Sequence, residues 1–245
     1  MAAKGLGQIV AAAGQAGIAR EELLRFAEDA AKMGVAFDMS GDQAGAAMTG
    51  LRNVFKLTQD QTVSLGDAIN QLANNMDAKA ADMLRIASRA GSTARLIGLS
   101  GQQFSALGAT FLELKTAPEV AATGINALLM KMSTANKQGE KFEGALNRIG
   151  LSGEFVKKKM GEDAQGAILV VLESLKGSKD LMGDLSDLFG MEYSDDMAKL
   201  VGGLDTYRKA LGLVSDEQGY AGSMQREYEA RAATTANNLQ LLGNN

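Results

Sequence analysis

The clearest pattern of apolar and polar positions runs from Thr116 to Ser133 and predicts one long helix. Its apolar residues recur at spacings of four and three residues, so they share one helical face. That face consists of Ala121, Ile125, Leu128, Met132 and Ala135, widened by Ala122 and Leu129. Thr116 and Glu119 form a capping-box pattern, and Pro118, the only proline, suits the first turn because no N–H is needed there.

The uncharged run inside this helix is too short to cross a membrane. It covers 120–130, which is 11 residues, whereas a membrane-spanning helix needs about 20. We therefore expect a core helix that is buried between several neighbours.

Helical stripes of the same kind recur along the chain. They cover 20–37, 44–55, 65–76, 80–98, 104–114, 142–149, 164–175, 181–189, 194–211 and 216–242. Residues 1–17 are rich in Ala and Gly and predict only a short or frayed helix. Alternation with a period of two is not sustained anywhere, so we expect no strands. The predicted fold class is all-α, a compact bundle of about ten short-to-medium helices with a longer C-terminal helix that protrudes or packs on another chain.

Residue pairs typical of a helix N-terminus precede many of these stripes. A Ser or Thr three residues before Gln or Glu can satisfy two N–H groups of the first turn. Five such pairs occur, namely Ser40/Gln43, Thr58/Gln61, Ser100/Gln103, Thr116/Glu119 and Ser215/Gln218. Asp77 and Ser194 are the expected caps of the helices that follow them. The junctions 98–104 and 150–155 both read GLSG, which indicates either a glycine C-cap followed by a serine N-cap or an internal duplication.

The spacing of the stripes predicts two parts. Residues 1–215 are expected to form one helical core domain. Residues 216–245 form a C-terminal helix whose apolar residues are thinly spaced among polar ones. Such a helix suits self-association or continuation into a rod.

Composition narrows the classes of function. A net charge of −4 and a pI of about 5.1 argue against a nucleic-acid-binding surface. Cysteine and histidine are both absent, which excludes disulfides, thiolate nucleophiles, zinc fingers and imidazole bases. Glycine occurs 29 times beside a single proline, a balance that favours helix ends and close helix contacts over disordered linkers. No secretory signal pattern opens the chain as written.

Two charged clusters are candidate binding sites. The acidic one lies in 180–196 and contains Asp184, Asp187, Glu192, Asp195 and Asp196. Carboxylates suit a hard cation, but the spacing is not that of a calcium loop, so we favour a solvated acidic face. Asp195 and Asp196 are expected at a helix N-terminus, where negative charge is favourable. The basic run 157–159 lacks interleaved aromatic residues and is expected to be solvated surface.

No residue is nominated as catalytic, metal-binding or cofactor-binding. The sequence has no glycine-rich phosphate loop at a strand-to-helix junction and no nucleophile elbow. A carboxylate pair for sugar hydrolysis stays open among the 29 acidic residues, although no aromatic-lined cleft is indicated. The 13 methionines suit either a core or an adaptable groove, and core packing is favoured for Met48, Met76 and Met132. We expect neither enzymatic activity nor a cofactor.

Six stretches occur in a specific order along the chain. They are AGAAMTGLRNVFKL from Ala44, GDAINQLANNMDAKAADML from Gly66, RAGSTARLIGLSGQQFSALGATFLEL from Arg89, TAPEVAATGINALLMKMSTA from Thr116, KFEGALNRIGLS from Lys141 and LFGMEYSDDMAKLVGGLD from Leu188. In this order and spacing they resemble the core region of the tape-measure proteins of long-tailed bacteriophages and prophages. The resemblance covers roughly residues 9–213.

The resemblance implies a structural virion protein that lies inside the tail tube, sets tail length during assembly and leaves ahead of the DNA. Implied partners are the tail-tube protein, baseplate or tail-tip proteins and tail assembly chaperones, and the implied locations are the virion and, during assembly, the host cytoplasm. Family members are generally much longer and carry extended rods. We therefore expect this segment to be a docking or assembly module, with the ruler outside it.

Two other functions stay open from the sequence. One is a membrane-active module that helps the genome across the cell envelope, for which the helices over 116–133 and 164–175 are the candidates. Liposome flotation distinguishes it from a docking module. The other is a lytic enzyme, which peptidoglycan turnover would reveal. Homo-oligomerisation through the C-terminal helix is compatible with the docking role.

Overall fold

A computed structural model describes residues 7, 9–11, 13–14 and 17–243, and for 235–243 it describes the backbone alone. Within these residues the protein contains 14 α-helices and no strands, which confirms the all-α prediction. The helices are α2 (Leu23–Ala36), α3 (Gly41–Phe55), α4 (Gln59–Asn75), α5 (Ala80–Ile97), α6 (Gly101–Glu113), α7 (Pro118–Ser133), α8 (Glu140–Arg148), α9 (Gly153–Glu162), α10 (Ala164–Lys176), α11 (Leu181–Phe189), α12 (Met191–Gly202), α13 (Leu204–Ser215), α14 (Glu217–Tyr220) and α15 (Ser223–Gly243). Two 3₁₀ turns, η1 (Arg20–Glu22) and η2 (Ala135–Lys137), precede α2 and α8.

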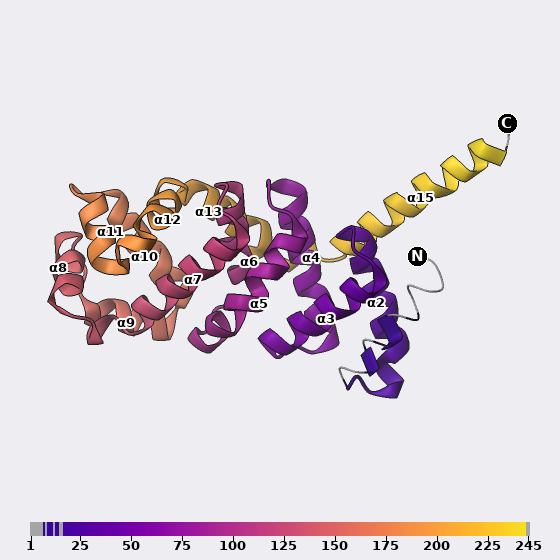
Figure 1. Cartoon of the computed structure of the whole chain (residues 1–245), viewed down its shortest axis with the longest axis horizontal. Helices are drawn as coiled ribbons and strands as arrows, with labels where there is room; N and C mark the ends of the chain where they lie inside the picture. The colour runs from indigo at the N-terminus through magenta and orange to yellow at the C-terminus, as the bar shows by residue number, and fades with distance from the viewer. Residues whose placement is uncertain (1–6, 8, 12, 15–16, 244–245) are drawn as a thin grey trace.

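The chain runs along an elongated body and then returns (Figure 1). Helices α2 to α7 lead from one end toward the other, where α8, α9 and α11 form the far end. The return passes through α12 and α13, and α13 packs against α6 and α4. At the end of the return, α15 starts beside α2 and α4, so early and late parts of the chain meet there.

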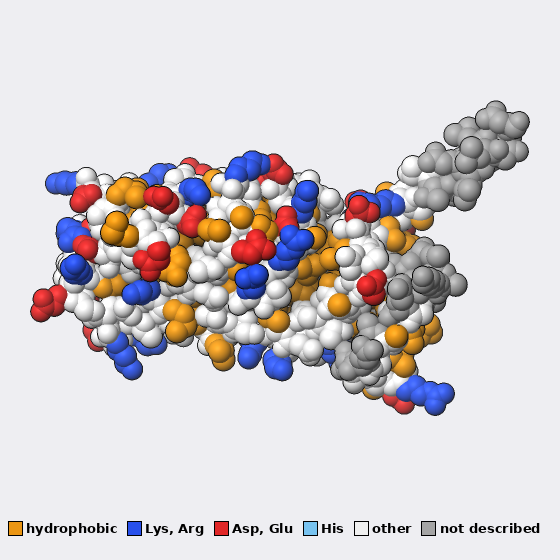
Figure 2. Space-filling model, viewed as in Figure 1, with side chains coloured by type: hydrophobic (Ala, Val, Ile, Leu, Met, Phe, Trp, Pro, Cys, Tyr) orange, Lys and Arg blue, Asp and Glu red, His pale blue; other side chains and the backbone are white. Residues whose placement is uncertain are grey.

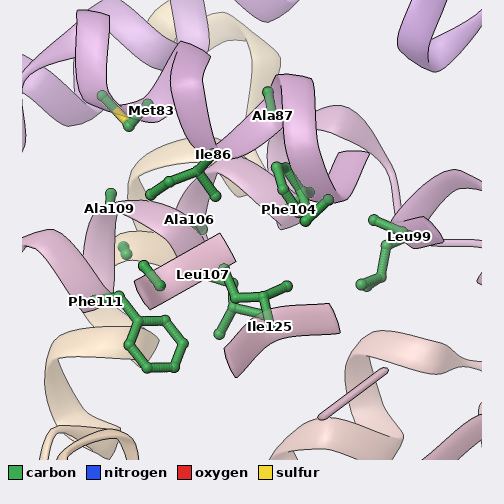
Figure 3. Packing of buried hydrophobic residues seen from close by; sticks show 14 of the residues in the cluster. Met83, Ile86, Ala87, Leu99, Phe104, Ala106, Leu107, Ala109, Phe111 and Ile125 are labelled. Atoms are coloured by element: carbon green, nitrogen blue, oxygen red, sulfur yellow. The ribbon is translucent and has the colours of Figure 1, made fainter. Parts of the chain in front are cut away.

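The core is built from the apolar stripes that the sequence predicts. Around α5, α6 and α7, the side chains of Ile86, Phe104, Phe111 and Ile125 lie inside and are at most 1% exposed (Figure 3). The whole predicted face of α7 is buried, including Leu128 and Met132. Burial of such side chains is the main favourable term in folding, so the stripes hold the body together.

Three of the five predicted capping boxes are present. Ser40/Gln43, Thr58/Gln61 and Ser100/Gln103 each form the reciprocal pair of bonds at the start of α3, α4 and α6. The two GLSG junctions also adopt the same local structure. Gly98 and Gly150 are left-handed, at φ 93° and 80°, and the serine two residues later caps the next helix. These junctions are C-cap and N-cap pairs, which is the first of the two alternatives. Internal duplication, the second alternative, stays a hypothesis.

The predicted box at Thr116 and Glu119 is wrong, because α7 begins two residues later. Ala117, which precedes a proline, adopts an extended conformation (φ −61°, ψ 145°) and is the N-cap. A residue before proline avoids the helical region, so a helix cannot include Ala117 here. The Thr116 side chain turns inward instead, and its hydroxyl has no hydrogen-bond partner in the described structure.

Two further predicted caps are wrong as well. Ser215 ends α13, and Asp216 caps α14 by accepting the Gln218 N–H at 3.0 Å. Asp77 lies in the turn before α5, whose N-cap is Lys79, and it pairs with Lys115 instead. In the first case a carboxylate one residue closer to the helix replaces the predicted cap. In the second case the predicted cap forms an ion pair instead.

Two predicted helices are each divided in the structure. The stripe over 194–211 belongs to α12 and α13, which are separated at Gly203, where an added Cβ would lie 2.5 Å from Leu114 Cδ1. Because α12 begins at Met191, Ser194 is not its cap, and Asp195 and Asp196 lie past its first turn. The segment over 216–242 forms α14 and α15, which are separated at left-handed Gly222 (φ 72°). The stripe over 20–37 begins with the 3₁₀ turn η1.

The predicted helix over residues 1–17 lies largely outside the described residues. Of these, residues 7, 9–11 and 13–14 are helical. Ile9 and Ala13 are completely buried and belong to the hydrophobic core. The described part of this segment therefore packs on the body.

Candidate functional site

The most distinctive polar arrangement in the described structure is the joint between α4 and the start of α15. Asp67, in the middle of α4, accepts the N–H of Gly222 at 2.8 Å and the N–H of Met224 at 2.8 Å. These N–H groups belong to the first turn of α15, which has no helical acceptors of its own. Asp67 therefore caps α15 from a helix that lies about 155 residues earlier in the chain.

Two neighbouring side chains of α4 complete this joint. Asn70 donates to the hydroxyl of Ser223 at 2.8 Å, and both groups are buried. Gly66 leaves room for the Met224 side chain, because an added Cβ would lie 2.6 Å from its terminal methyl group. Met224 is only 2% exposed. Polar bonds and one apolar anchor thus fix the point where α15 leaves the body.

The environment of Asp67 raises its pKa above the ordinary value of 3.8. Burial has the largest effect, since a charged carboxylate loses hydration when it is only 4% exposed. The hydrogen bonds from Met224 and Gly222 and the charge of Arg226 act in the opposite direction. The positive end of the α15 dipole also faces this carboxylate, which suits an anion.

The short helix α14 lies between α13 and this joint and is bonded to α4 and α6. Ser64 of α4 donates to the Glu217 carboxylate at 2.8 Å, and Gln102 of α6 lies 3.4 Å from the Tyr220 hydroxyl. A hollow lies on each side of Tyr220, with volumes of about 410 and 380 Å³. Tyr220 is 4% exposed, so the segment is attached to the body before Gly222 as well.

Beyond its first turn α15 leaves the body (Figure 1). Residues 229–234 are exposed, and pairs one turn apart support this stretch, such as the bond from Arg231 to Glu227 at 2.8 Å. Pairs four residues apart stabilise a helix that has few tertiary contacts. The joint therefore sets the direction of a helix that presents most of its described surface to solvent.

The acidic cluster is only in part the solvated face that we expected, because Glu192 and Asp195 are exposed whereas Asp184 and Asp196 are buried. Asp184 is 2% exposed, and Arg148 of α8 donates to it at 2.6 Å and to Asp187 at 2.7 Å. These two carboxylates raise the pKa of Arg148, chiefly through the bonds to Asp187 and Asp184. Asp180 caps α11 through the N–H of Gly183, and Asp196 pairs with Lys199. The cluster thus joins α8 to α11, which the sequence could not show because the key cation lies outside the cluster.

No group of three or more acidic side chains that could hold a metal ion converges among the described residues. The basic run 157–159 lies on α9, where Lys158 and Lys159 pair with Glu162 and Asp163. Lysine and arginine alternate with acidic side chains across the face shown in Figure 2. Met48, Met76 and Met132 are buried, which confirms their core positions. Among the described residues, no helix is both long and apolar enough to cross a membrane.

The fold of the described residues is all-α, and the comparisons with known proteins place the chain in a family. The family model of phage-related minor tail proteins matches residues 1–190, so the chain belongs to the phage-related minor tail protein family. Membership identifies it as a structural protein of a phage tail.

One relative has a more specific description than the family. The chain is 36% identical, over 234 residues, to a "Probable tape measure protein" of Halomonas phage phiHAP-1. The match includes 91% of this chain and 27% of that relative, so the chain spans about a quarter of the relative's length. No solved structure matches the chain. The family that the sequence resembles is thereby confirmed.

Proposed function

We propose that this chain is a folded docking and assembly module of a tail tape-measure protein and that the length-measuring rod lies outside it. The observation that supports the proposal is the fold itself. A continuous helix of 245 residues would be about 370 Å long at about 1.5 Å per residue. The longest helix here, α15, has 21 residues, and the chain returns to its starting region. Residues added inside such a body change its bulk rather than its length.

The proposed role gives the joint a function. A module that holds one end of a long helical protein needs a fixed exit direction, and Asp67 and Asn70 fix the first turn of α15. We propose that α15 leads toward the rod or pairs with α15 of other copies. The proposed partners are the tail-tube protein, baseplate or tail-tip proteins and assembly chaperones, met first in the host cytoplasm and then inside the tail tube. On this proposal the module is not an enzyme and leaves the tail ahead of the DNA.

A membrane-active role is the alternative. Its candidate helices are α7 and α10, but their apolar faces, with Leu128 and Leu172 completely buried, form part of the core. The body would have to open before these faces could reach a bilayer. We therefore favour docking, and the absence of flotation with liposomes of several compositions would support that preference.

Tail length in virions tests the docking proposal. We would insert the same 28-residue helical sequence, four heptads, at one of two places in the full-length protein. One is the exposed loop between Gln138 and Gly139, before α8, and the other is after Ala233 in α15. A ruler lengthens by about 42 Å for 28 helical residues. We expect the loop insertion to leave tail length unchanged and the α15 insertion to add about that length.

The outcome depends on a folded module, so each insertion is first checked by circular dichroism and thermal unfolding of the purified protein. A loop insertion that lengthens tails by the full helical increment would refute the docking proposal. An α15 insertion without effect on length would refute only the proposal that α15 leads into the rod.

A further inference from the structure

Residues 216–226, which we call the strap, form a unit whose backbone hydrogen bonds are internal. The strap consists of Asp216, α14, the turn at Gly222 and the first turn of α15. Its backbone bonds run, for example, from Ala221 to Glu217 and from Arg226 to Gly222. Among the described residues, no backbone–backbone hydrogen bond joins the strap to α2, α4 or α6. The strap can therefore separate from these helices without breaking a backbone bond of either side.

The part of α4 that receives the strap, which we call the seat, is a polar stripe. Ser64, Asp67 and Asn70 follow at intervals of three residues, so they share one face of α4. Each of them bonds to the strap: Ser64 to Glu217, Asp67 to Gly222 and Met224, and Asn70 to Ser223. Such bonds replace bonds to water, so their net contribution to attachment is small. The seat thus differs from the apolar faces that hold the body together.

Two apolar side chains anchor the strap, and one of them is incompletely packed. Met224 is 2% exposed and Tyr220 is 4% exposed. The Tyr220 hydroxyl lies 3.5 Å from Ser64 Oγ and 3.4 Å from Gln102 Nε2, and hydrogen bonds beyond about 3.2 Å are weak. The hollows of about 410 and 380 Å³ both border Tyr220, so it lacks packing partners on these sides.

We propose that the strap is a swivel, which detaches from α4 and α6 as one unit while the body stays folded and so lets α15 turn. Its connection to α13 is already accessible, since residues 215–219 are exposed. Polar contacts of this kind within a chain resemble transient interfaces. A segment with few apolar anchors opens at a lower free energy than an apolar core, so the strap opens before α7 does.

This inference rests on the proposed function, which gives the swivel a use. While it is attached, the strap holds α15 in the direction that docking needs. Figure 1 shows that α15 is inclined to the long axis of the body. Once the strap is detached, α15 can lie along that axis, which suits a protein that leaves through a tail tube.

Native-state hydrogen exchange of the whole chain, measured by NMR at several urea concentrations below the unfolding transition, tests this proposal. The probes are the hydrogen-bonded amides of Gly219, Ala221, Met224 and Arg226. We expect them to share one opening constant, at least about a hundredfold larger than that of the amides in α7, which a whole apolar face protects. The four constants should also rise together with urea, because one opening exposes one area of surface.

Two results would overturn the proposal. Protection of the strap equal to that of α7 would show that the strap opens only when the whole protein unfolds. Protection that declines steadily from Gly219 to Arg226 would show that α15 frays from its exposed end and that no unit exists. Both results come from the unaltered chain, so they decide the question even where a variant does not fold.

A substitution at one end of the seat tests whether α14 and α15 open together. Ser64→Ala removes the bond to Glu217 of α14. If the strap is one unit, exchange should become about fivefold faster at Met224 as well as at Ala221, since one hydrogen bond is lost. Faster exchange confined to α14 would contradict the proposal.

The reciprocal substitution lies at the other end of the seat. Asn70→Ala removes the bond to Ser223 of α15 and should accelerate exchange at Ala221 by the same factor as at Met224. Asn74→Ala, which changes an exposed side chain of the same helix, is the matched control and should leave both amides unchanged. An effect of Asn70→Ala that stops at α15 would mean that the two helices open independently.

Two spin labels measure whether α15 turns. The chain has no cysteine, so Ser92→Cys on α5 and Ala233→Cys on α15, both exposed, carry the only labels. We expect one narrow distance distribution in the parent and a broader one when Ser64→Ala and Asn70→Ala are added, while the amides of α7 keep their protection. A distribution that stays narrow although the strap exchanges faster would show that detachment does not turn α15, and it would overturn the swivel.

The swivel and the docking function can fail separately. Tail length in virions tests the module's role without measuring how the strap opens. Hydrogen exchange and spin-label distances measure the opening without any virion.

Discussion

The central helix α7 and the C-terminal helix α15 are attached to the molecule in opposite ways. Along α7 an apolar face is buried from Ala121 to Met132, so packing holds the helix over its whole length. On α15, among the side chains described up to residue 234, only Ser223 and Met224 in the first turn are fully buried, and the polar groups of Asp67 and Asn70 hold this turn. Apolar stripes thus build this body, whereas a polar joint determines where α15 leaves it.

The largest effect is expected for a substitution in the buried face of α7. Leu128→Ala in α7 removes a completely buried side chain and leaves a cavity, which costs about 2–5 kcal/mol of unfolding free energy. Denaturant unfolding followed by circular dichroism measures it. Met130→Ala, on the same helix but 53% exposed, is the control and should change stability by no more than about 0.5 kcal/mol. Equal effects of the two variants would mean that α7 is not a core helix.

A smaller and more local effect is expected at the joint. Asp67→Ala leaves the buried N–H of Met224 and the part-buried N–H of Gly222 without their acceptor, which costs about 1–3 kcal/mol. Hydrogen exchange should become faster at 222–226, while the amides of α7 keep their protection. Asp60→Ala, which removes an exposed carboxylate from the same helix, should leave both regions unchanged. Slower or unchanged exchange at 222–226 would show that Asp67 does not hold α15.

The comparison also explains which features the sequence predicts. Stripes and capping boxes are local, so the buried face of α7 and the boxes at Ser40, Thr58 and Ser100 could be derived from spacing alone. The start of α7 can also be predicted from the sequence. Ala117 precedes Pro118, and the restriction on that residue excludes the box at Thr116, although the letter pattern suggested it.

The joint could not be derived in the same way. Asp67 occupies a position inside an ordinary helix, and its partners lie about 155 residues later. The neighbouring residues in the sequence do not distinguish an aspartate that caps a distant helix from an aspartate that faces water. The same holds for Asp184, whose cation is Arg148 of another helix. Polar bonds between distant elements follow from the fold rather than from local spacing.

The smallest expected effect concerns the pH dependence of the joint and tests whether burial or hydrogen bonding dominates at Asp67. Its folded-state pKa is raised above 3.8, so the folded protein holds this proton more tightly than the unfolded chain does. The contribution of Asp67 to stability is therefore fully present below pH 3.8 and is lost as the pH rises through the raised value.

Asp67→Asn lacks this titration, while all other carboxylates titrate alike in both proteins. We expect the stability of the parent minus that of Asp67→Asn, measured by urea unfolding between pH 3 and pH 7, to fall as the pH rises. A difference that grows with pH would mean that the bonds from Gly222 and Met224 and the start of α15 outweigh burial, and that the joint holds α15 best when Asp67 is charged.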